Sequence, residues 1–312
     1  MQGVSLTALW TAAQRAQESA RPDRLVEDPL AETLAGPEGA RIMEILQAGE
    51  PPSPTVAIRT RFFDDRIVDR TSAGTGLEGT GLEGTGLEGT GREGTGREGP
   101  ARQVVLLGAG MDSRAFRLGL LPHVTVFELD HPELLRLKDQ RLERAGAKPT
   151  CERRSVPCDL GGAWVVELLS SGFSTKEASV FVAEGLLMYL DEREVDGLLD
   201  VLGTLSVPGS TLLADVCGRS LRYSPYMTEW FAGLERAGMA WRFATDEPEV
   251  LLAEHGWEAD VVRYGDERAH FGRWPGPKVD RSNLAWPQSY LVEGTRAHVE
   301  PGKAQAGQPV LG

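Results

Sequence analysis

The residues with the clearest chemical potential stand where two apolar runs end. The first run, 104–107, leads into a Gly-Ala-Gly turn at 108–110. The second run, 124–129, ends at Asp130, which lies 20 residues beyond Gly110. Closely spaced glycines let the backbone approach a ligand, and an acid at the end of the next strand can accept hydrogen bonds from a ribose. The pattern predicts half of a nucleotide-binding α/β sheet in an enzyme that holds a nucleotide-like cofactor.

The glycine turn departs from the dinucleotide pattern at its third position, which is Ser113. The pyrophosphate of NAD or FAD needs the full G-x-G-x-x-G turn beside a helix N-terminus. S-adenosylmethionine has a ribose and an adenine but no phosphate, so the shorter turn suits it better. We expect methyl transfer. The alternatives are an NAD(P)-type or flavin-dependent Rossmann oxidoreductase and a non-catalytic S-adenosylmethionine-binding protein.

Several motifs follow one another in a family-specific order. They are TAAQRAQES at 11–19, EDPLA at 27–31, RTRFFDD at 59–65, the segment 107–117, FELDHP at 127–132 and AEGLLMYL at 183–190. Together they resemble the leucine carboxyl methyltransferase family, and especially its bacterial S-adenosylmethionine-dependent O-methyltransferases, which are often linked to secondary metabolism. The resemblance covers about residues 5–296 except for one repetitive insert. It is specific for family and cofactor but not for the methyl acceptor.

The elements that must position these residues alternate between strand-like and helical runs. Alternating strands and helices predict an α/β, doubly wound, mostly parallel sheet, which in this family is a seven-stranded Rossmann-like methyltransferase sheet. Strands are predicted at 103–107, 124–129, 155–160, 178–184, 210–216, 258–263 and 289–294, with helices at about 132–145, after Asp191 and at 251–257.

The chain divides into four predicted regions. Residues 1–72 are an N-terminal helical lid with a cofactor-gripping segment, and residues 101–296 are the methyltransferase core. Between them, 73–100 hold five pentapeptide copies, three of GTGLE and two of GTGRE. Two glycines in each copy make ordering costly, so we expect a disordered loop without chemistry. The polar tail, 297–312, is also expected to be disordered.

The first helix is predicted over 5–19. Leu6, Leu9, Trp10 and Ala13 share one face of it, and Ser5 is placed to cap it. Two functions are open for this helix: packing on the core, or, as the family resemblance implies, covering the active site as a lid.

The strand ends supply most of the candidate cofactor residues, because open α/β sheets bind ligands there. Gly108 and Gly110 would let the methionine part of the cofactor lie against the backbone. Asp130 would take the ribose hydroxyls, unless it is simply a surface carboxylate.

The third strand supplies the candidates for the adenine. Asp159 would accept a hydrogen bond from the adenine amino group, with a helix N-cap before Gly161 as the alternative. Its neighbour Leu160 would supply an amide and an apolar contact to the ring.

The resemblance implies two further roles, and Arg15 is added as a third candidate. Glu184 would lie beside the bound cofactor near its amino group, and a role as catalytic base is less favoured. Arg59 matches the arginine that grips the methionine carboxylate, with Arg61 as the alternative; a guanidinium suits that bidentate task. Arg15 is a weaker candidate for the cofactor or acceptor carboxylate, since it could equally lie on a solvated helix face.

The acceptor is expected to be a small molecule with a carboxylate or an acidic phenol, because no catalytic histidine constellation is present. A polyketide-type secondary metabolite would fit. Substrate contacts are expected in 219–243, whose aromatic density suits an apolar acceptor but is equally explained by a hydrophobic core. The side chains in question are Tyr223, Tyr226, Met227, Trp230, Phe231, Trp241 and Phe243.

Composition excludes several other classes. The net charge of −13 and the lack of a basic stripe argue against nucleic acid. Cys151, Cys158 and Cys217 are scattered, which predicts reduced thiols in a cytoplasmic protein, and the five histidines lack metal-ligand spacing. No apolar run approaches the ~20 residues of a membrane span, and the N-terminus lacks the pattern of a signal peptide.

Overall fold

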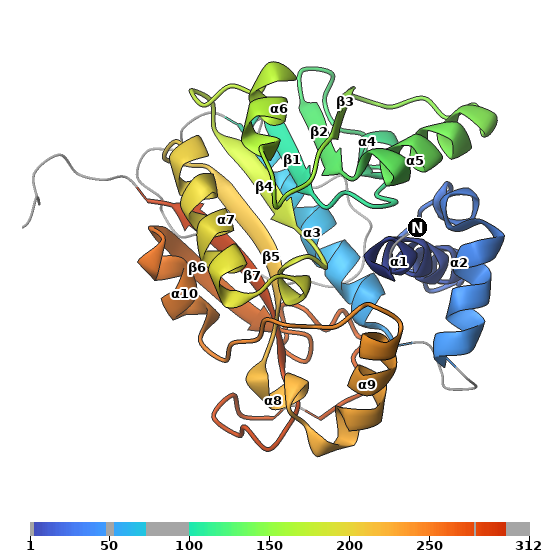
Figure 1. Ribbon diagram of the computed structural model, residues 1–312, viewed down its shortest axis with the longest axis vertical. Coiled ribbons are helices and arrows are strands. Elements are labelled where there is room, and N and C mark those ends of the chain that lie inside the picture. Colours follow the sequence, from blue (N-terminus) through green and yellow to red (C-terminus); the bar gives the residue numbers. More distant parts are fainter. Residues whose placement is uncertain (1–2, 48–52, 73–99, 278, 298–312) are drawn as a thin grey trace, which may run out of the picture.

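The computed structural model describes residues 3–47, 53–72, 100–277 and 279–297. Its strands form a single seven-stranded sheet in the order β3-β2-β1-β4-β5-β7-β6 (Figure 1). Strand β7 runs antiparallel to both of its neighbours, and all other pairs are parallel. The strands are β1 (Gln103–Leu107), β2 (Thr125–Asp130), β3 (Glu152–Pro157), β4 (Ser179–Ala183), β5 (Thr211–Cys217), β6 (Trp257–Arg263) and β7 (Ser289–Arg296). The predicted doubly wound, mostly parallel sheet is confirmed.

Ten α-helices accompany the sheet in the described ranges. They are α1 (Gly3–Ser19), α2 (Ala31–Gln47), α3 (Thr55–Thr71), α4 (Arg114–Arg117), α5 (Pro132–Arg144), α6 (Trp164–Ser170), α7 (Glu192–Leu205), α8 (Arg219–Arg222), α9 (Thr228–Arg236) and α10 (Pro248–Glu254). Two short 3₁₀ turns, η1 (Leu187–Tyr189) and η2 (Pro225–Met227), complete the set.

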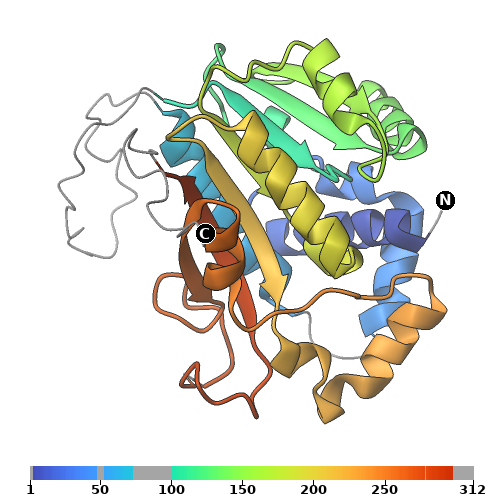
Figure 2. The same cartoon turned by 60° about the vertical axis from the view of Figure 1, so that its left-hand side comes forward.

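The central strand β1 is apolar throughout because both of its faces are covered. Val105 and Leu107 pack in the cluster that contains α7, whereas Val104 and Leu106 pack in the cluster that contains α3. Helix α7 lies across its face of the sheet as the yellow helix in Figure 2. Asp191 caps α7 as predicted, in a reciprocal capping box with Glu194.

Helix α3 belongs to the sheet layers, although it precedes the first strand by more than 30 residues. Its buried apolar side chains lie against β1, β4, β5 and β7. They are Ile58, Phe62, Phe63 and Ile67. The α1–α2 pair instead packs beside α5. The predicted N-terminal region, 1–72, therefore contains two separate structural units. One is the α1–α2 pair, and the other is α3, which covers one face of the sheet.

Three predicted boundaries are wrong. Strand β3 covers 152–157 and not 155–160, because it pairs with β2 from Glu152 onward. The first residues of this edge strand are charged, so the sequence does not show the apolar pattern of a strand there. Helix α1 begins at Gly3, so Ser5 lies inside the helix and not at its N-cap. Helix α10 ends at Glu254, and Trp257 begins β6 instead of closing the helix.

The predicted repeat loop and the predicted tail fall almost wholly on 73–99 and 298–312, outside the described residues. The described chain on either side of the repeats is joined by a backbone hydrogen bond of 2.9 Å from Ala101 N to Arg70 O. None of the described helices has the length and apolar character needed to cross a bilayer.

Candidate active site

A cavity of about 1450 Å³ opens where β1, β2, β4 and β5 end. Small-molecule sites commonly measure about 300–1,000 Å³, so this cavity has room for more than one molecule. The sheet brings all seven candidate cofactor residues into its wall. They are Arg59, Gly108, Gly110, Asp130, Asp159, Leu160 and Glu184.

The glycine turn after β1 needs glycine at both positions. Gly108 has φ 67° and Gly110 has φ 46°, which is the left-handed region that side chains disfavour. A Cβ on Gly110 would also lie 3.0 Å from the Cβ of Ala8 in α1. Helix α1 therefore lies directly over the turn, in the position that a lid would occupy.

Asp130 joins this turn to the end of β2. Its Oδ2 accepts a hydrogen bond of 2.7 Å from Gly110 N, and its Oδ1 accepts one of 2.7 Å from His131 N. Burial raises the pKa of Asp130 even though both backbone donors oppose that rise. A carboxylate offers about four lone-pair sites, so each oxygen can still accept from a ribose hydroxyl.

Asp159 lies two residues beyond the end of β3 and is exposed. Its Oδ1 accepts a 2.9 Å hydrogen bond from Gly161 N, which forms a local turn. The alternative N-cap role is wrong, because the next helix, α6, begins at Trp164 with Ala163 at its N-cap. The second oxygen of Asp159 is left for a ligand.

Arg59 and Glu184 meet although 125 positions separate them. Arg59 Nε donates to Glu184 Oε1 over 2.9 Å, and Arg59 Nη1 donates to Asp215 Oδ2 over 2.8 Å. Nη2 has no hydrogen-bond partner in the described part of the chain, so Arg59 can still donate to an anion. Asp215 also accepts from Gly185 N and so holds the backbone that follows β4.

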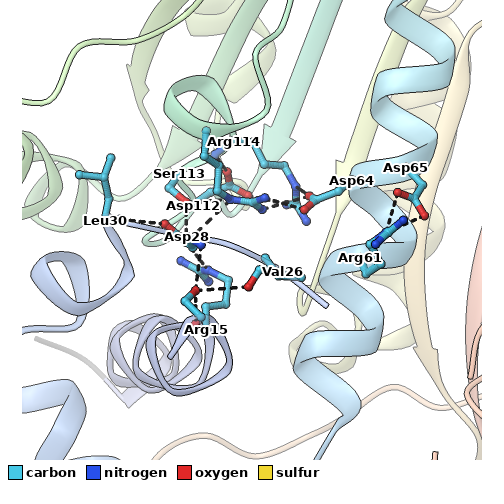
Figure 3. A network of polar contacts seen from close by, with 12 residues as sticks. Arg15, Val26, Asp28, Leu30, Arg61, Asp64, Asp65, Asp112, Ser113 and Arg114 are labelled. Atoms are coloured by element: carbon cyan, nitrogen blue, oxygen red, sulfur yellow. Dashed lines mark hydrogen bonds and ion pairs between the residues drawn. The ribbon is translucent and has the colours of Figure 1, made fainter. Parts of the chain in front are cut away.

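Glu184 also belongs to a buried network of ion pairs, part of which Figure 3 shows. Arg114 is at its centre and contacts Asp64, Asp112 and Glu184. Burial opposes the charge of Glu184, but Arg114 and Arg59 hold its pKa below the ordinary value. In the same way Arg114, Lys138 and other cations overcome burial and lower the pKa of Asp112 to about 2.

The two other arginine candidates, Arg61 and Arg15, lie in different environments. Arg61 pairs with Asp65 on another side of α3, away from the network, and does not line the cavity in the described structure (Figure 3). Arg15 is 8% exposed, so the solvated-face alternative is wrong. It donates to Asp28 and to the carbonyl oxygen of Met111, which ties α1 to the glycine turn.

The predicted acceptor segment divides into two groups. Tyr226, Met227, Trp230 and Trp241 line the cavity. Phe231 and Phe243 are buried in hydrophobic clusters, and Tyr223 is 69% exposed. The core explanation therefore holds for Phe231 and Phe243, and contact with the acceptor stays a prediction for the residues that line the cavity.

Sequence reasoning missed several charged residues of the site. Asp215 could have been found, because it is an acid within the otherwise apolar strand β5. The partnerships of Asp28, Asp64 and Asp112 had no comparable local signal. No group of side chains that could hold a metal ion is present in the described ranges.

The fold is a seven-stranded, mostly parallel α/β sheet, and two solved structures share this architecture. A DUF574 family protein from Streptomyces avermitilis has a TM-score of 0.58 at 13% identity, covering 91% of this chain and 96% of its own. A "putative methyltransferase" from Thermobifida fusca has a TM-score of 0.56 at 14% identity, covering 85% and 92%. At such identities the likeness concerns the fold alone.

Sequence relatives cover nearly the whole chain. A protein from Frankia alni is 36% identical over 89% of this chain and 92% of its own length, and one from Mycobacterium avium is 34% identical over 95% and 91%. Both carry the name "Putative S-adenosyl-L-methionine-dependent methyltransferase". The model of the leucine carboxyl methyltransferase family matches residues 8–77 and 92–203, and the chain belongs to that family. The predicted class, a methyltransferase that uses S-adenosylmethionine, is thereby confirmed, and the oxidoreductase alternative is set aside.

Proposed function

We propose that the protein transfers a methyl group from S-adenosylmethionine to an oxygen atom of a small molecule, either a carboxylate or an acidic phenol, of the kind found in polyketide-type secondary metabolism. The observation that carries the proposal is the convergence of the glycine turn, Asp130 and the Arg59–Glu184 pair on one cavity whose wall continues into aromatic side chains. We also infer the cytoplasm as its compartment, since all three cysteines are free and buried.

The residues of the site fit the cofactor group by group. Gly108 and Gly110 leave room beside the backbone, and Asp130 retains lone pairs for the ribose hydroxyls. Arg59 Nη2 would take the methionine carboxylate, and Glu184 would take the amino group. Asp159 would accept a hydrogen bond from the adenine amino group, and Leu160 would lie beside the adenine ring.

The ionisation state of the site residues determines which acceptor the protein can methylate. When bound, S-adenosylmethionine supplies an electrophilic methyl group on a sulfonium centre. The chain's task is to orient the acceptor oxygen in line with that group and to exclude water, which α1 does by covering the turn. Glu184 is a poor base because its pKa is held low, so the acceptor must bring an oxygen that is ionised or ionises readily.

A labelled-methyl assay tests this proposal. The protein is incubated with methyl-labelled S-adenosylmethionine and a panel of aromatic acids and polyketide-like phenols, and label in an organic product is measured. Brief alkaline treatment then separates the two acceptor classes, because it hydrolyses a methyl ester and spares an aryl methyl ether.

Calorimetry with S-adenosylhomocysteine and with NAD completes the test. Binding of S-adenosylhomocysteine without label transfer to any compound would favour the non-catalytic alternative. Tight binding of NAD would contradict the assignment of the strand-end residues.

A further inference from the structure

Tyr264 occupies the end of the cavity opposite the ribose and adenine candidates. It follows the last residue of β6, whose carboxyl end lies at the same sheet edge as that of β5 because β7 runs antiparallel to both. Arg263 is paired with Tyr290, and Cys217 is paired with Ser289, so Tyr264 begins beside the end of β5. It lines the cavity and is 6% exposed.

The Tyr264 ring is held rigidly by its neighbours. It packs against the indole of Trp274, with ring centroids 5.8 Å apart. A Cβ on Gly265 or Gly276 would lie 2.9 or 2.8 Å from Trp274 Nε1, so both glycine backbones clamp that indole. No hydrogen-bond partner for the Tyr264 hydroxyl is present among the described residues. The hydroxyl oxygen is not among the fully buried unpaired atoms of the described residues, so it is accessible from the cavity with its hydrogen-bonding capacity unused, which points to a ligand there.

The permanent cations of the cavity wall, in contrast, are already paired. The pairs are Arg15 with Asp28, Arg59 with Glu184 and Asp215, Arg114 and Arg117 with Asp64, and Arg263 with Asp266. No lysine lines the cavity within the described ranges. Two guanidinium nitrogens are left over among these described pairs. Arg59 Nη2 is assigned to the cofactor by the proposed function, and Arg15 Nη1 belongs to a side chain that is bonded to Met111 O beside the glycine turn, at the cofactor end of the cavity. An acceptor carboxylate would therefore meet Asp215 and Glu184 without a free cation to compensate it.

We propose that the Tyr264 hydroxyl donates a hydrogen bond to the acceptor oxygen, and that the acceptor is an aromatic hydroxyl compound rather than a carboxylic acid. This inference rests on the proposed methyl transfer and narrows its substrate class. A single hydroxyl donor matches a single phenolic oxygen, and the aromatic wall around Trp230 and Trp241 matches an aryl ring.

Tyr264 acts as a donor and not as a base. Burial and the nearby Asp215 carboxylate raise its pKa, so the hydroxyl keeps its proton. The acceptor binds as the neutral phenol, its proton is released to solvent as the methyl group is transferred, and the hydrogen bond from Tyr264 stabilises the negative charge that develops on the acceptor oxygen. Tyr264 is thus a binding and specificity-determining residue.

Probe binding to the full-length protein saturated with S-adenosylhomocysteine tests the inference. The probes are β-naphthol, β-naphthoate and β-methylnaphthalene, which differ only in the substituent on one ring system, and affinity is measured by calorimetry. We expect β-naphthol to bind the unmodified protein more tightly than β-naphthoate. Tyr264→Phe should weaken β-naphthol by about tenfold, the size of one hydrogen bond, and leave β-methylnaphthalene unchanged. Tyr223→Phe is the matched control, because Tyr223 is exposed and outside the described cavity wall, and it should change no affinity.

Several outcomes would overturn the inference. Equal weakening of all three probes by Tyr264→Phe would mean that the hydroxyl only maintains packing. Tighter binding of β-naphthoate than of β-naphthol would assign the site to carboxylates, and absence of saturable binding by every probe would remove the aromatic acceptor. These results concern Tyr264 and the class of acceptor, whereas failure to bind S-adenosylhomocysteine would contradict the proposed function itself.

Discussion

The two ends of the cavity are built on different principles. The cofactor end, over β1, β2 and β4, is polar, and its side chains are fixed by ion pairs that reach from Arg15 to Asp215. The acceptor end is closed by the segment after β5, where Trp230, Phe231 and Trp241 contact one another edge to face. One end is a charge network that tolerates little change, and the other is an aromatic cluster whose members can be exchanged more freely. We expect substitutions at the first end to affect folding and cofactor binding, and substitutions at the second to affect acceptor choice.

The largest effect should come from Arg114→Met, which removes the centre of the charge network. Asp64, Asp112 and Glu184 would lose a shared cation, and an uncompensated buried charge costs about 3–5 kcal/mol. Denaturant unfolding should show a loss of that size. Arg61→Met is the control, since its pair with Asp65 is largely exposed and is worth at most about 1 kcal/mol. Equal effects of the two variants would mean that the network is not structural.

Asp130→Ala should weaken cofactor binding by about 100-fold or more, because two hydrogen bonds to a charged group, each worth about 1.5–3 kcal/mol, would be lost. Asp130→Asn keeps one acceptor oxygen and should lose less. Calorimetry with S-adenosylhomocysteine measures the effect, and circular dichroism checks that the sheet persists. Unchanged affinity in Asp130→Ala would place the ribose contact elsewhere and require the strand-end assignments to be redrawn.

Acid should weaken the cofactor end through Asp112. Its pKa in the folded protein lies below the ordinary value, so its contribution to stability is present above about 3.8 and is lost as the pH falls through about 2. Lowering the pKa from 3.8 to about 2 corresponds to about 2 kcal/mol. Asp112→Asn should therefore be less stable than the parent at neutral pH, and the gap should narrow in acid. The exposed Asp69→Asn should show no such gap.

At the acceptor end, Trp230→Leu should have a milder effect. Its edge-to-face contacts with Phe231 and Trp241 are each worth about 0.5–1.5 kcal/mol, so the free energy of unfolding should fall by about 1–3 kcal/mol. Affinity for S-adenosylhomocysteine should stay at the level of the unmodified protein. A large loss of cofactor affinity would contradict the separation of the two ends.

The smallest effect should follow deletion of 74–98. The described chain already closes across this segment through the hydrogen bond between Ala101 N and Arg70 O, and the entropy of loop closure depends weakly on loop length. Melting temperature and cofactor affinity should remain nearly unchanged. A marked fall in the melting temperature would show that the repeats contribute packing.

The difference between the two ends also explains how far the sequence could predict the site. Gly108, Gly110 and Asp130 were predictable because a turn and a strand end are local requirements, and they lie in one cavity as expected. The partners of Arg59 were not, because Asp215 is 156 positions away and comes close to Arg59 only through the packing of α3 on β5.

Two errors have equally local causes. The range predicted for β3 began three residues too late, because the strand starts with Glu152, Arg153 and Arg154. Charged side chains are tolerated in a strand at the edge of the sheet, so the sequence there does not look like a strand. In the acceptor segment, aromatic composition alone could not separate Trp230, which lines the cavity, from Phe243, which packs in the core.

The closure of the chain between Arg70 and Ala101 has a practical consequence for the experimenter. The hydrogen bond between Ala101 and Arg70 lies just before the start of β1. The cavity lies at the opposite edge of the sheet, because the residues that line it follow the carboxyl end of β1. A foreign domain or a fluorescent reporter placed between Arg70 and Ala101 would enter the chain at an interior position without approaching the reaction. The chain between Arg70 and Ala101 is therefore a suitable place for the insertion of a label or of a second domain.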